Sequence, residues 1–168
     1  ILKAARLIND EKATQIIEHI TYNRLDAAYD QDVFTRATLR GKLDVNAMEA
    51  NRSLYSHVIY DSDNERRFAQ ELDVSDQVAV YVKLPGSFYI STPVGKYNPD
   101  WAIAFNEGSV KHIYFVAETK GNLDTMELRG VENAKIECAK KHFAAISNGS
   151  VVYSVVDNYS TLMQLVSN

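Results

Sequence analysis

Five short runs of apolar and β-branched residues follow one another in the second half of the chain. Turn-forming residues such as Pro85-Gly86 separate them, a pattern that predicts β-strands. We expect strands over Val78–Leu84, Ser87–Thr92, Asp100–Phe105, Lys111–Lys120 and Val151–Val156. Glu107-Gly108 lies between the third and fourth runs and predicts a hairpin, so these two strands should be antiparallel neighbours.

Apolar residues at intervals of three and four predict helices on either side of these runs. One helix should start at Asp61 or Ser62, and its stripe contains Glu65, Phe68 and Leu72. Glu65 therefore points toward the core, where a carboxylate is costly unless it is paired or metal-bound. It could also reach solvent, because it lies in the first turn. Further helical segments are expected over residues 126–145 and 162–166.

The order of these elements predicts an α/β fold. A long helix before the last strand returns the chain across the sheet, which implies a mixed central β-sheet flanked by helices. Residues 1–60 contain little chemistry and are expected to be mostly helical, a connector or arm with one helix over Glu11–Tyr22. Ser53–Tyr60 is read as either a short strand or the approach to a helix. Two parts are thus predicted, residues 1–60 and residues 61–168.

Composition and charge narrow the class of protein. The chain has 168 residues, of which 46% are hydrophobic and 24% charged, which is ordinary for a globular protein. Cys138 is the single cysteine, so an internal disulfide is excluded and a reducing, cytoplasmic location is expected. No membrane span or signal peptide is predicted. Because the chain starts with Ile1, we expect it to be a piece of a longer protein.

The formal net charge of −4 argues against indiscriminate binding to nucleic acid. From Tyr81 to Ala145, however, eight Lys and Arg residues face seven Asp and Glu residues, a balance of +1. If two of those acids hold a metal ion, the surface around them is more basic than the count suggests. The charge distribution therefore permits DNA binding without requiring it.

Polar residues at the ends of two neighbouring predicted strands carry the candidate chemistry. Asp100 precedes one strand, and Glu118 and Lys120 end the next, with both side chains on one face because strand side chains alternate. Carboxylates together with the backbone carbonyl of Thr119 are hard oxygen ligands that suit Mg²⁺. One or two such ions would promote hydrolysis of a phosphodiester. Lys120 would orient or deprotonate the attacking water, or stabilise charge on phosphorus, and Glu65 would complete the metal shell.

Each of these residues also has an ordinary structural interpretation. A Pro-Asp pair before a strand is commonly a turn, and Glu-x-Lys on a strand is commonly an exposed charge pair. Glu65 would then only interact with the helix dipole. Lys135, on the predicted helix 126–145, would belong to a solvated helix face and not to a DNA-binding surface.

The same residues lie in longer blocks that resemble a known family. VKLPGSFYISTPVGKYNPDWAIAF (residues 82–105) and YFVAETKG (114–121) are similar to the nuclease domain of type III restriction enzymes, within the PD-(D/E)xK superfamily. YDSDNERRFAQEL (60–72) and LRGVENAKIECAKKHF (128–143) resemble the helices before and after the catalytic strands. ITYNRLDAAYD (20–30) is similar to the connector that precedes the nuclease in the restriction (Res) subunit.

The resemblance implies a PD-(D/E)xK restriction-endonuclease-like fold and a type III site-specific deoxyribonuclease. The family's catalytic residues fall on Asp100, Glu118 and Lys120, and its supporting acidic helix position falls on Glu65. Polar side chains near the scissile phosphate would be Arg129 and Lys135. Implied are Mg²⁺, double-stranded DNA, a helicase-like ATPase region that uses ATP, a methyltransferase subunit that reads the sequence, and dimeric action for double-strand cleavage.

Two other functions remain compatible with the residues. One is a nuclease-like module that binds DNA or partner subunits without cutting, although the complete Asp100, Glu118 and Lys120 set argues against it. The other is a Mg²⁺-dependent enzyme acting on a small phosphate ester, which would need a closed pocket instead of an open cleft.

Overall fold

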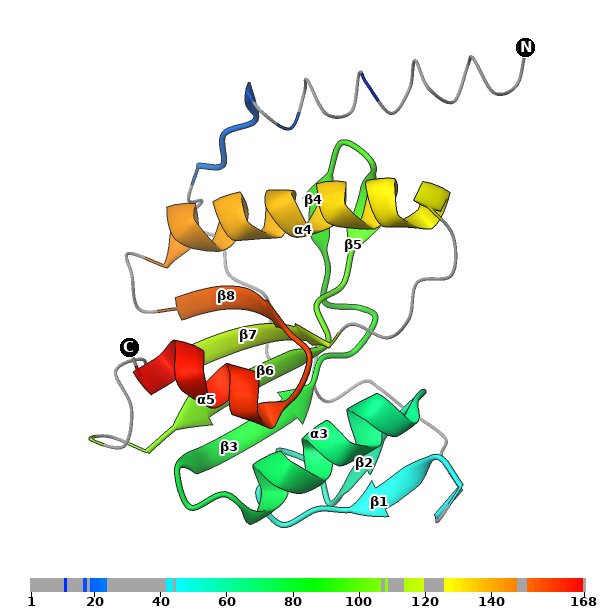
Figure 1. Cartoon of the computed structure of the whole chain (residues 1–168), viewed down its shortest axis with the longest axis vertical. Coiled ribbons are helices and arrows are strands. Elements are labelled where there is room, and N and C mark those ends of the chain that lie inside the picture. Colours follow the sequence, from blue (N-terminus) through cyan, green and yellow to red (C-terminus); the bar gives the residue numbers. More distant parts are fainter. Residues whose placement is uncertain are drawn as a thin grey trace.

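A computed structural model of the chain describes residues 11, 17, 19–23, 42, 43, 45–106, 108, 114–119, 126–147 and 151–167, with the side chains of 114–118 and 126–129 excepted. Eight strands and three helices lie in these ranges (Figure 1). In chain order they are β1 (Ala47–Glu49), β2 (His57–Ile59), α3 (Asp63–Val74), β3 (Val78–Lys83), β4 (Ile90–Thr92), β5 (Gly95–Tyr97), β6 (Trp101–Phe105), β7 (Tyr114–Thr119), α4 (Met126–Ile146), β8 (Val151–Val156) and α5 (Tyr159–Ser167).

The central sheet has four strands in the order β3-β6-β7-β8. The β3–β6 and β6–β7 pairs are antiparallel, whereas β7 and β8 are parallel. β7 and β8 are parallel because α4, which lies between them in the chain, crosses over the sheet (Figure 1) and returns the chain to the end at which β7 begins. The predicted mixed sheet is confirmed, and so is the predicted hairpin between β6 and β7.

Helices cover both faces of the sheet, each over its own apolar cluster. Along β6 the side chains of Trp101, Ile103 and Phe105 all belong to the cluster beneath α3 and α5. On the other face, Val82 and Tyr153 pack against Ile136, Ala139 and Phe143 of α4. This three-layer arrangement, visible in Figure 1, is compatible with a restriction-endonuclease-like fold.

Helix α3 begins as the sequence predicts. Ser62 is the N-cap, and its hydroxyl accepts a hydrogen bond from the backbone N–H of Glu65. Phe68, Ala69 and Leu72 are buried on the predicted stripe. Glu65 starts this stripe, so its carboxylate is held at the edge of the sheet.

Two segments differ from the sequence prediction. Residues 47–49 and 57–59 form the antiparallel pair β1–β2. β1 lies where mostly helical structure is predicted, whereas β2 agrees with the strand alternative for Ser53–Tyr60. The predicted strand Ser87–Thr92 is shortened to β4, since Phe88 closes a turn with the carbonyl of Pro85. β4 then forms a hairpin with β5, which packs against α4 (Figure 1).

The loop between β1 and β2 is fastened to the central sheet. The N–H of Leu54 donates to the carbonyl of Tyr81, and the N–H of Tyr81 donates to the carbonyl of Arg52. The Asp73 carboxylate of α3 accepts hydrogen bonds from the N–H groups of Asn51 and Arg52. This segment is thus a fixed part of the structure, and the predicted division at residue 60 stays a prediction.

Most of the predicted helix Glu11–Tyr22 lies outside the described residues. Its described part contacts α4: the carbonyl of Ile17 accepts a hydrogen bond from Lys141, and the ring of Tyr22 meets the edge of His142. No helix within the described ranges is both long enough and apolar enough to cross a membrane.

Candidate active site

Asp100 lies where three strands of the sheet meet. It directly precedes β6, and its carbonyl accepts a hydrogen bond of 2.7 Å from the N–H of Leu84, just after β3. Its carboxylate Oδ2 accepts hydrogen bonds from the N–H and the hydroxyl of Thr119, at 2.8 and 2.7 Å. Asp100 is therefore held between β3 and the end of β7, the strand that carries Glu118.

Thr119 is the residue that fixes this carboxylate. It is buried, and besides donating to Asp100 its hydroxyl accepts a hydrogen bond of 3.3 Å from the indole N–H of Trp101. Trp101 is fully buried and pairs with Ala117 across β6 and β7, two residues from Thr119 on the same face. The sequence predicts only a carbonyl ligand at Thr119 and does not reveal the contact of its hydroxyl with Asp100. Strand alternation from Ala117 would have placed it beside Trp101.

Of Glu118 and Lys120, the structure describes only the backbone of Glu118. The backbone of Glu118 belongs to β7 and pairs with Val155 of β8. Trp101 pairs with Ala117 in the antiparallel register of β6 and β7. Asp100 precedes Trp101 and Glu118 follows Ala117, so the same register places the backbones of Asp100 and Glu118 opposite each other. The side chain of Glu118 and the whole of Lys120 lie outside the described residues, so their predicted common face stays a prediction.

Glu65 forms an ion pair next to Asp100. Its Oε2 accepts hydrogen bonds from Lys83 Nζ at 2.5 Å and from the N–H of Asp61 at 2.8 Å. Lys83 also binds the Asp61 carboxylate at 2.7 Å. The Lys83 and Glu65 side chains are only 19% and 14% exposed, whereas that of Asp61 is 80% exposed, so the pair with Glu65 is the shielded one.

Lys83 was not singled out in the sequence, although a signal was present. It ends β3, and alternation along this strand puts it on the same face as the buried Tyr81. A lysine at such a position requires a partner of opposite charge. The apolar stripe of α3 contains one, Glu65.

The charges around Asp100 compete with one another. Burial raises the pKa of its carboxyl group above the usual value, the hydrogen bonds from Thr119 lower it, the charge of Glu65 raises it and that of Lys83 lowers it, with a net increase. For Lys83, burial lowers the pKa, but the hydrogen bonds and charges of Asp61 and Glu65 outweigh this effect and raise it. Lys83 thus stays an ammonium at neutral pH, bound by two carboxylates and within electrostatic range of a third, so that acidic groups outnumber it.

This surplus and the donor chemistry fit a divalent cation. Asp100 Oδ1 accepts no hydrogen bond from the described residues, so one hard oxygen remains for a ligand. Among the side chains that the structure describes, no three His, Cys, Asp or Glu residues form a metal-binding group. The sequence prediction draws its second carboxylate from Glu118, whose side chain lies outside the described residues.

The two residues proposed from the resemblance to contact DNA lie on α4. The Arg129 backbone is helical, but its side chain is not described. Lys135 is partly buried and forms a 3.7 Å ion pair with Glu132 one turn before it. Because α4 covers the face opposite to α3, Lys135 and Glu65 come from different sides of the sheet.

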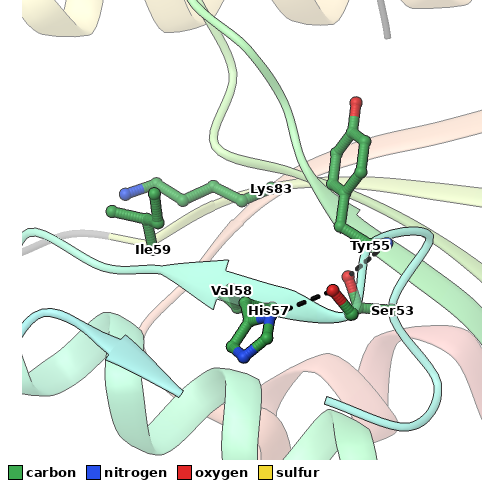
Figure 2. A pocket seen from close by; sticks show the side chains of 7 residues that line it. Ser53, Tyr55, His57, Val58, Ile59 and Lys83 are labelled. Atoms are coloured by element: carbon green, nitrogen blue, oxygen red, sulfur yellow. Dashed lines mark hydrogen bonds between the residues drawn. The ribbon is translucent and has the colours of Figure 1, made fainter. Parts of the chain in front are cut away.

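A pocket of about 200 Å³ lies beside this charged group (Figure 2). Its walls are Ser53 and residues 55–59 of the β1–β2 segment together with Lys83 of β3. Figure 2 shows Ser53 and Tyr55 toward one end, and Ile59 with the Lys83 ammonium toward the other. Lys83 is thus shared by the pocket and the group around Asp100.

The fold and the site together describe an α/β domain with a mixed sheet between helices and an aspartate fixed at the ends of its central strands, an arrangement compatible with a nuclease. Comparison with protein families agrees with this class. Residues 51–159, more than half of the chain, match a family described as an endonuclease domain. The chain belongs to this endonuclease-domain family. Searches of curated proteins and of solved structures gave no match.

Proposed function

We propose that this endonuclease domain is the Mg²⁺-dependent DNA-cleaving module of a type III restriction enzyme. The observation that supports it most directly is the Asp100 carboxylate, which Thr119 holds at the end of the strand carrying Glu118, with Lys120 following Thr119 in the sequence. The family match supports cleavage of nucleic acid, and the similarity of residues 82–105 and 114–121 supports the type III assignment.

In this proposal Asp100, Glu118 and the carbonyl of Thr119 hold one or two Mg²⁺ ions. Bound Mg²⁺ would polarise the scissile phosphate and lower the pKa of the attacking water. The chain itself orients the Asp100 carboxylate before the ion binds. The N–H and hydroxyl of Thr119 both donate to Oδ2, and these contacts fix the orientation of Oδ1, which is left for the ion. Lys120 would orient the water or stabilise charge on the phosphate.

Glu65 is proposed to support the metal site. Oε2 is occupied by Lys83 and the N–H of Asp61, so any direct contact with an ion falls to Oε1. Whether or not Glu65 contacts the ion directly, its negative charge acts on Asp100 and favours a cation there. We retain Arg129 and Lys135 as proposed contacts to the DNA backbone, for which the resemblance is the support.

The proposed partners follow from the resemblance alone. They are double-stranded DNA, a helicase-like region of the same subunit that hydrolyses ATP, and a methyltransferase subunit that selects the sequence. Cutting both strands needs two active centres, so we propose that two copies act together. The proposed location is the cytoplasm.

The proposal is tested by comparing the wild-type chain with Asp100→Asn on plasmid DNA in Mg²⁺ and in EDTA. Asn keeps the shape of Asp but removes the charge that holds the cation, so nicking should fall to the EDTA background. Asp76→Asn is the matched control, because Asp76 is 99% exposed and lies at the other end of β3. Nicking that persists in Asp100→Asn would contradict the proposed centre.

A second readout separates cutting from metal binding. Mg²⁺ should raise the melting temperature of the wild-type chain, because an ion that binds only the folded state stabilises it. The same ion should have no effect on Asp100→Asn. Stabilisation that depends on Asp100, in a chain that never nicks DNA, would favour the alternative of a module that binds without cutting.

A further inference from the structure

The pocket between β2 and β3 has the chemistry of a site for a flat, neutral group. Among its described lining residues there is no carboxylate. The residues that line it include Tyr55, Val58 and Ile59, and most of the lining surface is apolar. Two serine hydroxyls and the His57 imidazole supply hydrogen-bonding groups. Aromatic and aliphatic walls with a few polar groups are what a nucleobase requires.

The one formal positive charge at the pocket is already compensated. The Lys83 ammonium is bound by Glu65 at 2.5 Å and by Asp61 at 2.7 Å. A phosphate placed against Lys83 would meet both carboxylates as well, so an anion is a poor occupant. The size agrees with a small group: about 200 Å³ is below the roughly 300–1,000 Å³ of sites for drug-sized ligands.

The pocket adjoins the candidate active centre. Lys83 forms part of its wall and is close enough to Asp100 to affect the carboxyl group electrostatically. The next residue, Leu84, donates its N–H to the carbonyl of Asp100 at 2.7 Å. A nucleotide chain with its phosphate at Asp100 would therefore bring a neighbouring base toward this pocket.

The pocket is also formed in advance by the fold. Its wall includes Ser53 of the segment 51–54, which is bound to β3 through Tyr81 and to α3 through Asp73, and wall residues 55–59 follow this segment directly. Within the wall, Ser56 Oγ and His57 Nδ1 lie 2.9 Å apart in a hydrogen bond, drawn in Figure 2. Such preorganisation lowers the entropic cost of binding.

We propose that this pocket receives an unstacked base of the DNA strand, next to the phosphate that is cleaved. The inference rests on the proposed active centre at Asp100 and adds a substrate subsite to it. Tyr55 would stack on the base, and Ser53, Ser56 and the imidazole of His57 would bind its edge. A base must leave the duplex to enter a pocket of this kind.

The probe for this proposal is the dinucleotide d(TpT), whose bases need not be unpaired first. The isotope-labelled chain is titrated with d(TpT) by NMR, with Ca²⁺ in place of Mg²⁺ so that binding is observed without cleavage. Backbone amide signals of residues 55–57 and of Thr119 are expected to shift together, because one phosphate and one base are held at adjoining sites.

Two tryptophan variants make the test specific. Ser56→Trp fills the pocket and should weaken d(TpT) binding about 5- to 100-fold, the range expected for losing one stacked base. Ser87→Trp adds the same side chain at another exposed serine outside the pocket and should leave the affinity unchanged within about twofold. Circular dichroism of both variants checks that the fold is retained.

The outcomes distinguish this inference from the proposed function. Shifts at Thr119 without shifts at residues 55–57, or equal affinity in Ser56→Trp, would overturn the pocket and keep the nuclease. Inorganic phosphate alone producing the same shifts at residues 55–57 would show an anion site and overturn the base. If d(TpT) does not bind at residues 55–57 and plasmid DNA is not cleaved, both proposals fail. Binding at residues 55–57 in a chain that never cuts would overturn the placement beside the cleaved phosphate.

Discussion

Thr119 forms three hydrogen bonds at the candidate site, and its hydroxyl takes part in two of them. It donates to Asp100 Oδ2 at 2.7 Å and accepts from the indole N–H of Trp101 at 3.3 Å. Because all three residues are wholly or largely shielded from solvent, water cannot replace these contacts readily. The hydroxyl thus connects a core tryptophan with the candidate metal ligand.

Replacing Thr119 by Val keeps the shape of the side chain and removes this connection. The free energy of unfolding should fall by about 1–3 kcal/mol, because the Trp101 N–H is left unpaired and Asp100 loses a donor. DNA nicking should fall as well, because the Asp100 carboxylate then keeps only the hydrogen bond from the backbone N–H of residue 119. Urea unfolding and plasmid cleavage measure the two effects.

Thr119→Ser is the matched control, since it retains the hydroxyl. It should preserve most of the activity, with a small loss of stability from the missing methyl group. A Val variant as stable and as active as the Ser variant would show that the hydroxyl contacts have no role in the site.

Glu65 and Lys83 show which contacts of the site can be predicted from the sequence and which cannot. The periodicity of α3 placed Glu65 on the buried side, and the structure agrees. Its partner Lys83 could not be deduced from the same pattern, because the pairing depends on how α3 lies across the end of β3. Contacts between elements distant in sequence require the packing to be known.

Among the elements, the strands of the central sheet were predicted well and the short hairpins poorly. Apolar runs of five or six residues, such as β3, β6 and β8, carry a clear signal. β1 and β2 have three residues each, too few to show a clear alternation of buried and exposed positions. Such short strands depend on tertiary contacts more than on local preference.

The β1–β2 segment is held largely by one side chain of α3. The Asp73 carboxylate accepts hydrogen bonds from the N–H groups of Asn51 and Arg52, at 2.9 and 2.8 Å, and from the hydroxyl of Tyr81 at 3.2 Å. Burial is the main cause that raises the pKa of Tyr81, followed by the charge and the hydrogen bond of Asp73. Tyr81 therefore remains a neutral hydroxyl that donates to this carboxylate.

Asp73→Ala should lower the free energy of unfolding by about 1–3 kcal/mol, because it removes the acceptor of several charge-assisted hydrogen bonds. Amide hydrogen exchange at residues 51–54 should accelerate along with it. Asp76→Ala is the control: Asp76 also binds Arg52, at 2.9 Å, but is 99% exposed and should have little effect. Equal exchange rates in the two variants would contradict the assignment of Asp73 as the anchor.

At the scale of the whole molecule, the candidate site lies at the end of a strand that has one core cluster on each of its faces. Trp101 belongs to the cluster under α3 and α5, and its neighbour Ala102 packs with the cluster under α4. Asp100 precedes both, at the end of the strand that they share. Topology alone predicted this location, since the polar ends of β6 and β7 had to meet once the hairpin was assigned.

The fastening of segment 51–54 onto β3 has a consequence for how the protein behaves in solution. β3 is an edge strand of the central sheet, and the hydrogen bonds of Tyr81 with Arg52 and Leu54 cover part of that edge. An uncovered edge is a template for pairing with another chain, and Val80 on this strand is already 40% exposed.

A chain shortened to residues 61–168 should therefore aggregate, whereas one that starts at residue 46 should remain monodisperse. Light scattering at increasing concentration compares the two. A monodisperse 61–168 fragment with an unchanged melting temperature would show that the edge needs no cover. If the shortened chain aggregates, residues 51–54 protect this protein against self-association, and an expression fragment has to include them.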